Sequence, residues 1–189
     1  MNNPKFKYPD TKAYNFVVQR LHERGVELSD LAQVAYDTQI NYEPQLTMAE
    51  CQEAVVDTMH KRELMNNAMV MLELDRLTEE GKIQEPLSSI IKADAGVFGV
   101  DETLALQIAT IYGTIGTTNF GYFDRVKTGI MKKFDTDGRH VNTFIDDLLS
   151  AIVAAVCGKI AHKYAWWDKR RIIRFFVIKI IHKTTDCDI

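Results

Sequence analysis

The sequence predicts an all-α fold, a single-domain bundle of several helices of which two are long. Apolar residues recur at intervals of three and four over most of the 189 residues, which is the spacing of one helix face. No convincing period of two, the mark of a half-buried strand, occurs before residue 172. With 46% hydrophobic residues and only 4 Pro and 10 Gly, the composition also excludes disorder and a disulfide-stapled miniprotein.

Capping and breaking residues set the expected bounds of the helices. Gly25 follows the first apolar face as a C-terminal cap would, and Thr47 and Glu50 have the spacing of a capping box. No Pro or Gly then follows before Gly81, which predicts one helix of roughly thirty residues. The expected helices cover residues 13–24, 29–38, 48–80, 86–91, 104–112 with Asp101 as its cap, 125–134, and 142 to about 162.

Two segments are ambiguous. Gly113, Gly116 and Gly121 interrupt the helical pattern, and they either bring backbone N–H groups to a phosphate or allow helices to end or cross closely. Residues 172–181 are rich in β-branched residues and form either a marginal strand or, as we favour, a helix. The turn 135–138 lacks the glutamate of a calcium-binding loop and is expected to be a solvated turn.

The charge is unevenly distributed, which predicts a helical domain over residues 1–163 and a basic aromatic tail over 164–189. The tail has six Lys and Arg against three Asp, so it carries +3 and the rest of the chain −6 of a net −3. Such a balance does not indicate nucleic-acid binding. As a helix with two Trp and two Phe, the tail suits an anionic membrane surface; a packing or oligomer-forming role is the alternative.

The cysteines and the apolar segments indicate the compartment. Cys51, Cys157 and Cys187 form no CxxC or zinc motif, which fits a reducing environment. The first 25 residues have no secretory h-region, and the most apolar stretch, 148–167, is interrupted by charged residues. We therefore expect a cytoplasmic protein, with peripheral contact to the inner face of the membrane as a further possibility.

Acidic residues form three clusters between residues 101 and 147. Carboxylates that share a partly buried pocket need a cation, and hard Mg²⁺ prefers oxygen ligands, commonly a few carboxylates and a substrate phosphate. Lys127, the basic residue among them, would meet that phosphate. The alternative is that each acid only caps a helix. Lys61 and Arg62 would reach a phosphate only if their helix face lined the same cleft. The three clusters are Asp101 with Glu102, Asp124 with Lys127, and Asp146 with Asp147.

Taken as a set, these motifs resemble the phosphatidylglycerophosphatase A family, in its soluble, all-helical branch from Gram-positive bacteria. The resemblance spans roughly residues 20–163 and does not include the apolar spans of the membrane-embedded members. The matching pieces are Arg24-Gly25-Val26, Lys61-Arg62-Glu63, Phe98-Gly99-Val100-Asp101-Glu102, Tyr112-Gly113-Thr114-Ile115-Gly116, Thr118-Asn119, Gly121-Tyr122, Asp124-Arg125-Val126-Lys127 and Thr143-Phe144-Ile145-Asp146-Asp147.

The resemblance implies a Mg²⁺-dependent phosphatase that removes the terminal phosphate of phosphatidylglycerophosphate. It assigns Asp101, Glu102, Asp146 and Asp147 to the metal, and with the carboxylate pattern it marks Asp124, Lys127 and Asp146 as catalytic candidates. A phosphorylated lipid or a small phosphomonoester is the expected substrate, attacked either by water or by an aspartate. The alternative is a non-catalytic module that self-associates through the long helix at 48–80, and a homo-oligomer is expected in either case.

Overall fold

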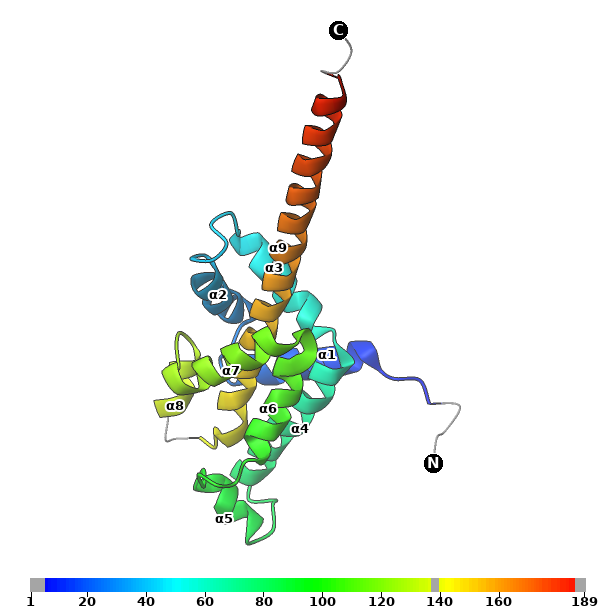
Figure 1. Cartoon of the computed structure of the whole chain (residues 1–189). Coiled ribbons are helices and arrows are strands. Elements are labelled where there is room, and N and C mark those ends of the chain that lie inside the picture. Colours follow the sequence, from blue (N-terminus) through cyan, green and yellow to red (C-terminus); the bar gives the residue numbers. More distant parts are fainter. Residues whose placement is uncertain (1–5, 137–139, 186–189) are drawn as a thin grey trace.

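The computed structural model describes residues 6–136 and 140–185, with side chains described for 6–134 and 140–165. Helices gather around one central helix, and the described residues contain no strand, which confirms the expected all-α fold (Figure 1). The helices are α1 (Asp10–Glu23), α2 (Leu28–Gln39), α3 (Met48–Met59), α4 (Arg62–Glu79), α5 (Leu87–Lys92), α6 (Val100–Ala109), the 3-10 turn η1 (Thr110–Tyr112), α7 (Thr114–Val126), α8 (Met131–Thr136) and α9 (Thr143–Thr185).

Helix α9 is the centre of the bundle. Helices α2, α3, α4, α6, α7 and α8 all pack against it. The run from Phe144 to Val156 is therefore buried on nearly every side, as expected for a helix whose sequence is apolar all round. Beyond Tyr164 the helix leaves the body and continues to Thr185 (Figure 1), so the tail is helical and the strand alternative is wrong. The boundary drawn at residue 163 falls inside this helix.

The long helix expected over 48–80 is wrong, because it divides into α3 and α4 at His60 and Lys61. Lys61 has an extended backbone, and the His60 ring stacks on Tyr14 with the ring centres 4.2 Å apart. Helix α3 packs against α2 and α9, whereas α4 packs against α1, α6 and α9. Tertiary packing on different neighbours thus turns the chain where the sequence contains no helix breaker.

Glycines allow the start of α7 to lie close to the end of α6 and to α9. A Cβ atom on Gly116 would lie 2.0 Å from the carbonyl oxygen of Ala109, and one on Gly158 would lie 3.3 Å from the backbone nitrogen of Gly116. The segment 113–121 is therefore mostly a helix with a close crossing, which supports the packing alternative over a phosphate-binding loop. Gly113 separates η1 from α7, as expected, whereas Gly116 and Gly121 lie inside α7, so the expectation that these two also interrupt the helical structure is wrong.

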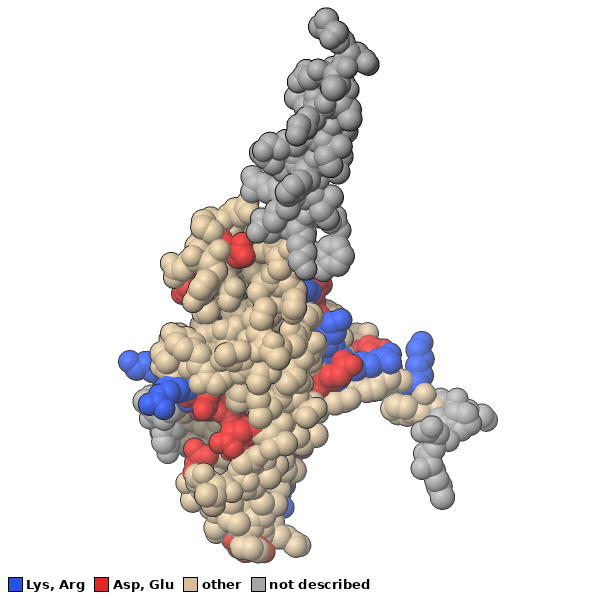
Figure 2. Space-filling model, in the orientation of Figure 1, with Lys and Arg blue, Asp and Glu red and all other residues tan. Residues whose placement is uncertain are grey.

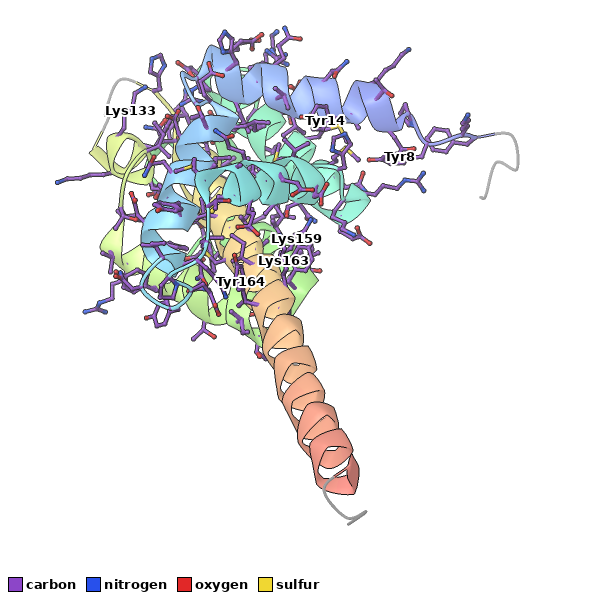
Figure 3. All side chains as sticks on the ribbon, turned by 90° about the horizontal axis from the view of Figure 1, so that it is seen from above. Tyr8, Tyr14, Lys133, Lys159, Lys163 and Tyr164 are labelled. Atoms are coloured by element: carbon purple, nitrogen blue, oxygen red, sulfur yellow. The ribbon has the colours of Figure 1, made fainter. Side chains whose placement is uncertain are left out.

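Polar contacts fix α9 to α3 where the central helix leaves the body (Figure 3). The expected capping box is confirmed, because Thr47 and Glu50 exchange hydrogen bonds at the start of α3. Glu50 also accepts hydrogen bonds from Lys163 (2.9 Å) and the Tyr164 hydroxyl (3.0 Å). The Lys163 ammonium lowers the pKa of Glu50 to about 2. One carboxylate therefore caps α3 and anchors the outer part of α9.

No helix among the described residues combines the length and the apolar composition needed to cross a bilayer. Cys51 and Cys157 are free and buried, so they are small residues of the core. Asp137 and Gly138 of the expected turn lie outside the described residues, as do the side chains of Asp135, Thr136 and residues 166–189.

Candidate active site: carboxylates around Lys127

Lys127 lies in the connection between α7 and α8, so the helix expected over 125–134 is wrong. Its backbone is left-handed, with φ 45° and ψ 77°, and it caps α7 by donating from its N–H to the Phe123 carbonyl at 2.9 Å. A non-glycine residue rarely adopts this conformation, and such strain is concentrated at functional sites. Gly129 is also left-handed, and the two residues together reverse the chain before α8.

The ammonium group of Lys127 lies among three carboxylates. Its Nζ is 2.5 Å from Oδ2 of Asp146, 2.9 Å from Oδ1 of Asp124 and 3.9 Å from Oδ1 of Asp147. Asp124 is in the last turn of α7, and Asp146 and Asp147 are in the first turns of α9. Figure 2 shows acidic and basic side chains grouped together on the face that bears α6 and α8. The structure therefore brings the expected catalytic residues together in one cluster.

Most of this cluster is withdrawn from water. The side chains of Lys127, Asp146 and Asp147 are only 15, 18 and 8% exposed, whereas Asp124 is 46% exposed. Burial raises the pKa of Asp147 to about 8, and the charges of Asp124, Asp146 and Asp101 act in the same direction against the opposing charge of Lys127. Burial disfavours the charged form of Lys127 too, but Asp146 and Asp124 outweigh it and raise the lysine pKa. The site thus has more buried carboxyl groups than one ammonium group can neutralise if all are ionised.

Asp101 and Glu102 lie in the first turn of α6 and act on the cluster through their charge. Gly99, in the left-handed region with φ 61°, precedes the helix, so the expectation that Asp101 is its cap is wrong. Asp101 is instead a buried helical residue whose Oδ1 accepts from the Glu102 N–H at 3.0 Å. Burial raises the pKa of Glu102, with further contributions from Asp101 and Asp124. The acids of α6 and α9 therefore influence one another, although in the contacts of the described residues only the α9 acids, and neither Asp101 nor Glu102, bond directly to Lys127.

The donor set fits a hard divalent cation. Four carboxyl groups, those of Glu102, Asp124, Asp146 and Asp147, interact electrostatically with a single ammonium group. Burial and the neighbouring acids raise the pKa of Glu102 and Asp147, and added positive charge would relieve this rise. Among the described residues, no group of three or more Asp, Glu, His or Cys side chains is arranged as a metal cage. Mg²⁺ does not need such a cage, because it commonly takes one or two carboxylates and completes its shell with water and substrate oxygens.

The other cationic candidates lie elsewhere. Arg62 forms an exposed two-point ion pair with Asp10, with nitrogen–oxygen distances of 2.7 and 2.9 Å. Lys61 is exposed at the break between α3 and α4. Neither residue interacts with Lys127 or its acids in the contacts described, so Lys61 and Arg62 belong to an exposed face and not to this site.

Sequence reasoning missed Asp75, a fully buried acid of α4 that binds the start of α9. A signal was available, since Asp75 follows Met71 and Leu72 by four and three positions and so shares their apolar helix face. An acid on a buried face requires a partner, but the sequence gives no means of naming one 69 positions away.

Comparison with known proteins identifies the class to which this fold and site belong. Residues 19–162 match the sequence profile of the phosphatidylglycerophosphatase A family, so the chain belongs to this family of phosphatases. Among its relatives, the protein YutG of Bacillus subtilis is 41% identical over 162 residues, covering 85% of this chain and 95% of YutG.

Solved structures share the fold as well as the sequence. The low temperature requirement C protein of Listeria monocytogenes superposes with a TM-score of 0.77 at 42% identity, covering 85% of this chain and 99% of the other. The protein ypjQ of Bacillus subtilis gives 0.79 at 35% identity, covering 84% and 98%. The described bundle is therefore the fold of these relatives.

Proposed function

We propose that the protein is a Mg²⁺-dependent phosphatase that hydrolyses a lipid phosphomonoester such as phosphatidylglycerophosphate. Family membership supports the class of reaction and substrate. The observation that carries the proposal for this chain is the buried contact of Lys127 with Asp146 beside Asp147, because it places a cation and several carboxylate oxygens at one point. A phosphoryl group needs both kinds of group, positive charge for its own oxygens and ligands for its metal.

The residues divide into roles according to their surroundings. Asp101, Glu102, Asp146 and Asp147 would hold Mg²⁺, which would polarise a phosphoryl oxygen and make a water molecule more acidic. Lys127 supplies positive charge to the phosphate, and the more exposed Asp124 orients the lysine by accepting its hydrogen bond. Without metal, Asp147 has a pKa of about 8, so its proton would be displaced near neutral pH when Mg²⁺ binds there.

Release of inorganic phosphate tests this proposal. Purified protein with Mg²⁺ is expected to release phosphate from phosphatidylglycerophosphate in mixed micelles, and Asp146→Asn and Asp101→Asn are each expected to abolish it. Glu53→Gln, which alters an exposed acid of α3, serves as the control with full activity. A parallel assay with glycerol phosphate distinguishes a lipid substrate from a small phosphomonoester. Unchanged turnover in both active-site variants would refute the assignment.

We further propose that the outer part of α9 contacts an anionic membrane, where a lipid substrate is found. The basic aromatic sequence and the extension of the helix away from the body support this proposal (Figure 1). Co-sedimentation with vesicles of phosphatidylglycerol and phosphatidylcholine would compare the full chain with a chain ending at Ala165. Residues up to Ala165 are kept because Lys163 and Tyr164 bind Glu50. Equal binding by both chains would remove this role.

Self-association stays a prediction, best tested by light scattering on the full chain. The non-catalytic alternative relied on one uninterrupted helix over 48–80, and the break at His60 and Lys61 takes away that particular surface.

A further inference from the structure

The amino end of α9 is capped by a residue from another helix. Oδ1 and Oδ2 of Asp75 lie 3.1 and 3.3 Å from the backbone nitrogen of Phe144, and Oδ2 accepts the N–H of Ile145 at 2.9 Å. The first N–H groups of a helix have no partner within it and are commonly capped by the residue just before the helix. Here the cap comes from α4, and it lies in the same turn as Asp146 and Asp147.

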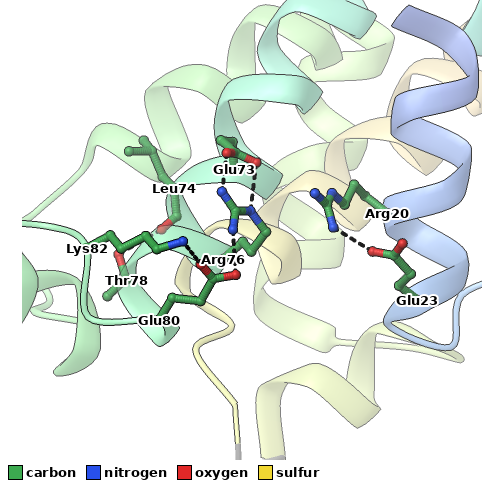
Figure 4. Close-up of polar contacts among 8 residues, drawn as sticks. All are labelled: Arg20, Glu23, Glu73, Leu74, Arg76, Thr78, Glu80 and Lys82. Atoms are coloured by element: carbon green, nitrogen blue, oxygen red, sulfur yellow. Dashed lines mark hydrogen bonds and ion pairs between the residues drawn. The ribbon is translucent and has the colours of Figure 1, made fainter. Parts of the chain in front are cut away.

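The surroundings of Asp75 suit a carboxylate that serves only this helix end. Its side chain is fully buried, and the neighbouring Arg76 forms ion pairs with Glu73 and Glu80 (Figure 4). Burial raises the pKa of Asp75 to about 7, while the hydrogen bonds from Phe144 and Ile145 oppose the rise. The positive end of the α9 dipole provides further compensation for its charge.

The start of α9 is also held by a contact that does not involve its backbone N–H groups. The hydroxyl of Thr143 donates to the carbonyl oxygen of Ile91 at 2.7 Å, in a buried position. Two buried interactions therefore fix the same helix end, but only the Asp75 interaction acts on the N–H groups immediately before Asp146. This difference provides a matched control.

We propose that Asp75 is a positioning residue, which sets the first turn of α9 so that Asp146 and Asp147 face Lys127. The proposal deepens the proposed function and rests on it, since Asp146 and Asp147 are the site residues that Asp75 would place. Within one helical turn the backbone moves as a unit, so a shift at Phe144 and Ile145 moves both carboxylates. Displacements of about 1 Å are enough to impair a catalytic arrangement.

Asp75→Asn and Thr143→Val form the experimental pair. Asparagine keeps the size of the side chain and is a good helix cap. Its amide has only one oxygen, however, and its amino group cannot accept a hydrogen bond, so it cannot replace both carboxylate oxygens that face the N–H groups of Phe144 and Ile145. Valine matches the shape of threonine, removes the bond to Ile91 and leaves the Asp75 contacts in place. Unfolding in urea would measure the stability lost in each variant, so that the site can be compared at known stability.

The first readout is the protection of Lys127 from an amine-acylating reagent, followed by mass spectrometry in metal-free protein with the exposed Lys12 as internal standard. The Lys127 ammonium is protected while it is bound by Asp146 and Asp124. Asp75→Asn is expected to raise the rate of Lys127 acylation about fivefold. Weakening a helix cap should increase by about this factor the population in which the first turn of α9 has moved and Lys127 is accessible. Thr143→Val is expected to leave the rate unchanged. Equal rates in the two variants would overturn the proposal.

The second readout is the dissociation constant for Mg²⁺ at equal protein concentration. It is expected to rise about tenfold in Asp75→Asn, as when a residue that orients a metal ligand is lost, and to stay unchanged in Thr143→Val. An equal rise in both variants would reduce Asp75 to a structural role and contradict the proposal. If wild-type protein bound no Mg²⁺ while the acylation difference persisted, the proposed function would fail and the positioning role would stand.

A measurement on the wild-type chain covers the case in which Asp75→Asn does not fold. The amide protons of Phe144 and Ile145 should exchange slowly with solvent deuterium, although unpaired first-turn amides normally exchange fast. Fast exchange at both positions would contradict the capping contact itself.

Discussion

The Nζ atom of Lys127 lies 2.5 Å from Oδ2 of Asp146, and this contact joins the end of α7 to the start of α9. Both side chains are largely buried, and the other carboxylate oxygen of Asp146, Oδ1, is buried as well. The pair is therefore an ion pair inside the protein, where breaking one partner leaves the other charged and poorly solvated.

Replacing the lysine should destabilise the protein as well as inactivate it. Lys127→Met keeps the side chain as far as the Cε position but leaves Asp146 and Asp147 without their nearby positive charge. We expect the free energy of unfolding at pH 7 to fall by about 3 kcal/mol, the cost of breaking a buried pair, and phosphate release to be lost. Unfolding in urea measures the first effect, with Lys12→Met as the exposed control. Equal stability of the two variants would contradict a buried ion pair.

The raised pKa of Asp147 predicts how stability depends on pH. Its pKa is about 8 in the folded protein and about 4 in the unfolded chain. The contribution of the protonated side chain to the free energy of unfolding is therefore complete below pH 4 and is lost as the pH rises through 8. Asp147→Asn is neutral at every pH and should therefore be more stable than wild type at pH 8, by at least about 1 kcal/mol.

Urea unfolding at pH 5 and pH 8 measures this difference. At pH 5 the folded wild-type side chain is already protonated, so the advantage of Asp147→Asn should be much smaller. Asp75, with a pKa of about 7, titrates in the same range in both proteins and largely cancels in the comparison. The same advantage at both pH values would mean that Asp147 is ionised throughout.

The close crossing of α7 predicts opposite effects for two glycines of that helix. Gly116→Ala would place a methyl group 2.0 Å from the carbonyl oxygen of Ala109, so we expect a loss of about 1–3 kcal/mol as the backbone shifts. A methyl group on Gly121 would meet no atom within 4 Å, so Gly121→Ala should stabilise by about 0.5–1 kcal/mol through helix propensity. Thermal unfolding of the two variants measures whether each substitution raises or lowers the stability. A stabilising Gly116→Ala would rule out the close crossing.

The sequence predicts the local features of this fold well. Helical periodicity predicts the all-α class, and the capping box of Thr47 and Glu50 is present at the start of α3. Both features depend on residues within one turn of each other, so neighbouring positions in the chain carry the necessary information.

Features that arise from tertiary packing are not visible in the sequence. The break at His60 and Lys61 exists because α3 packs on α2 whereas α4 packs on α1 and α6, and Gly116 of α7 serves a crossing whose partner, Gly158, lies in α9. The candidate site shows the same division. Its acids and Lys127 are recognisable by residue type, but the buried contact to Asp146 and the cap from Asp75 join distant segments.

The central claim is that the acids of α6 and α9 hold a divalent cation, and calorimetric titration with Mg²⁺ tests it most directly. Wild-type protein at pH 8 should bind Mg²⁺ with a defined stoichiometry and release protons, because binding requires ionised carboxylates. Asp146→Asn should lose this binding, while Glu53→Gln should keep it. Wild-type protein that produced no saturable heat, or an Asp146→Asn variant that bound Mg²⁺ as tightly as wild type, would contradict the account.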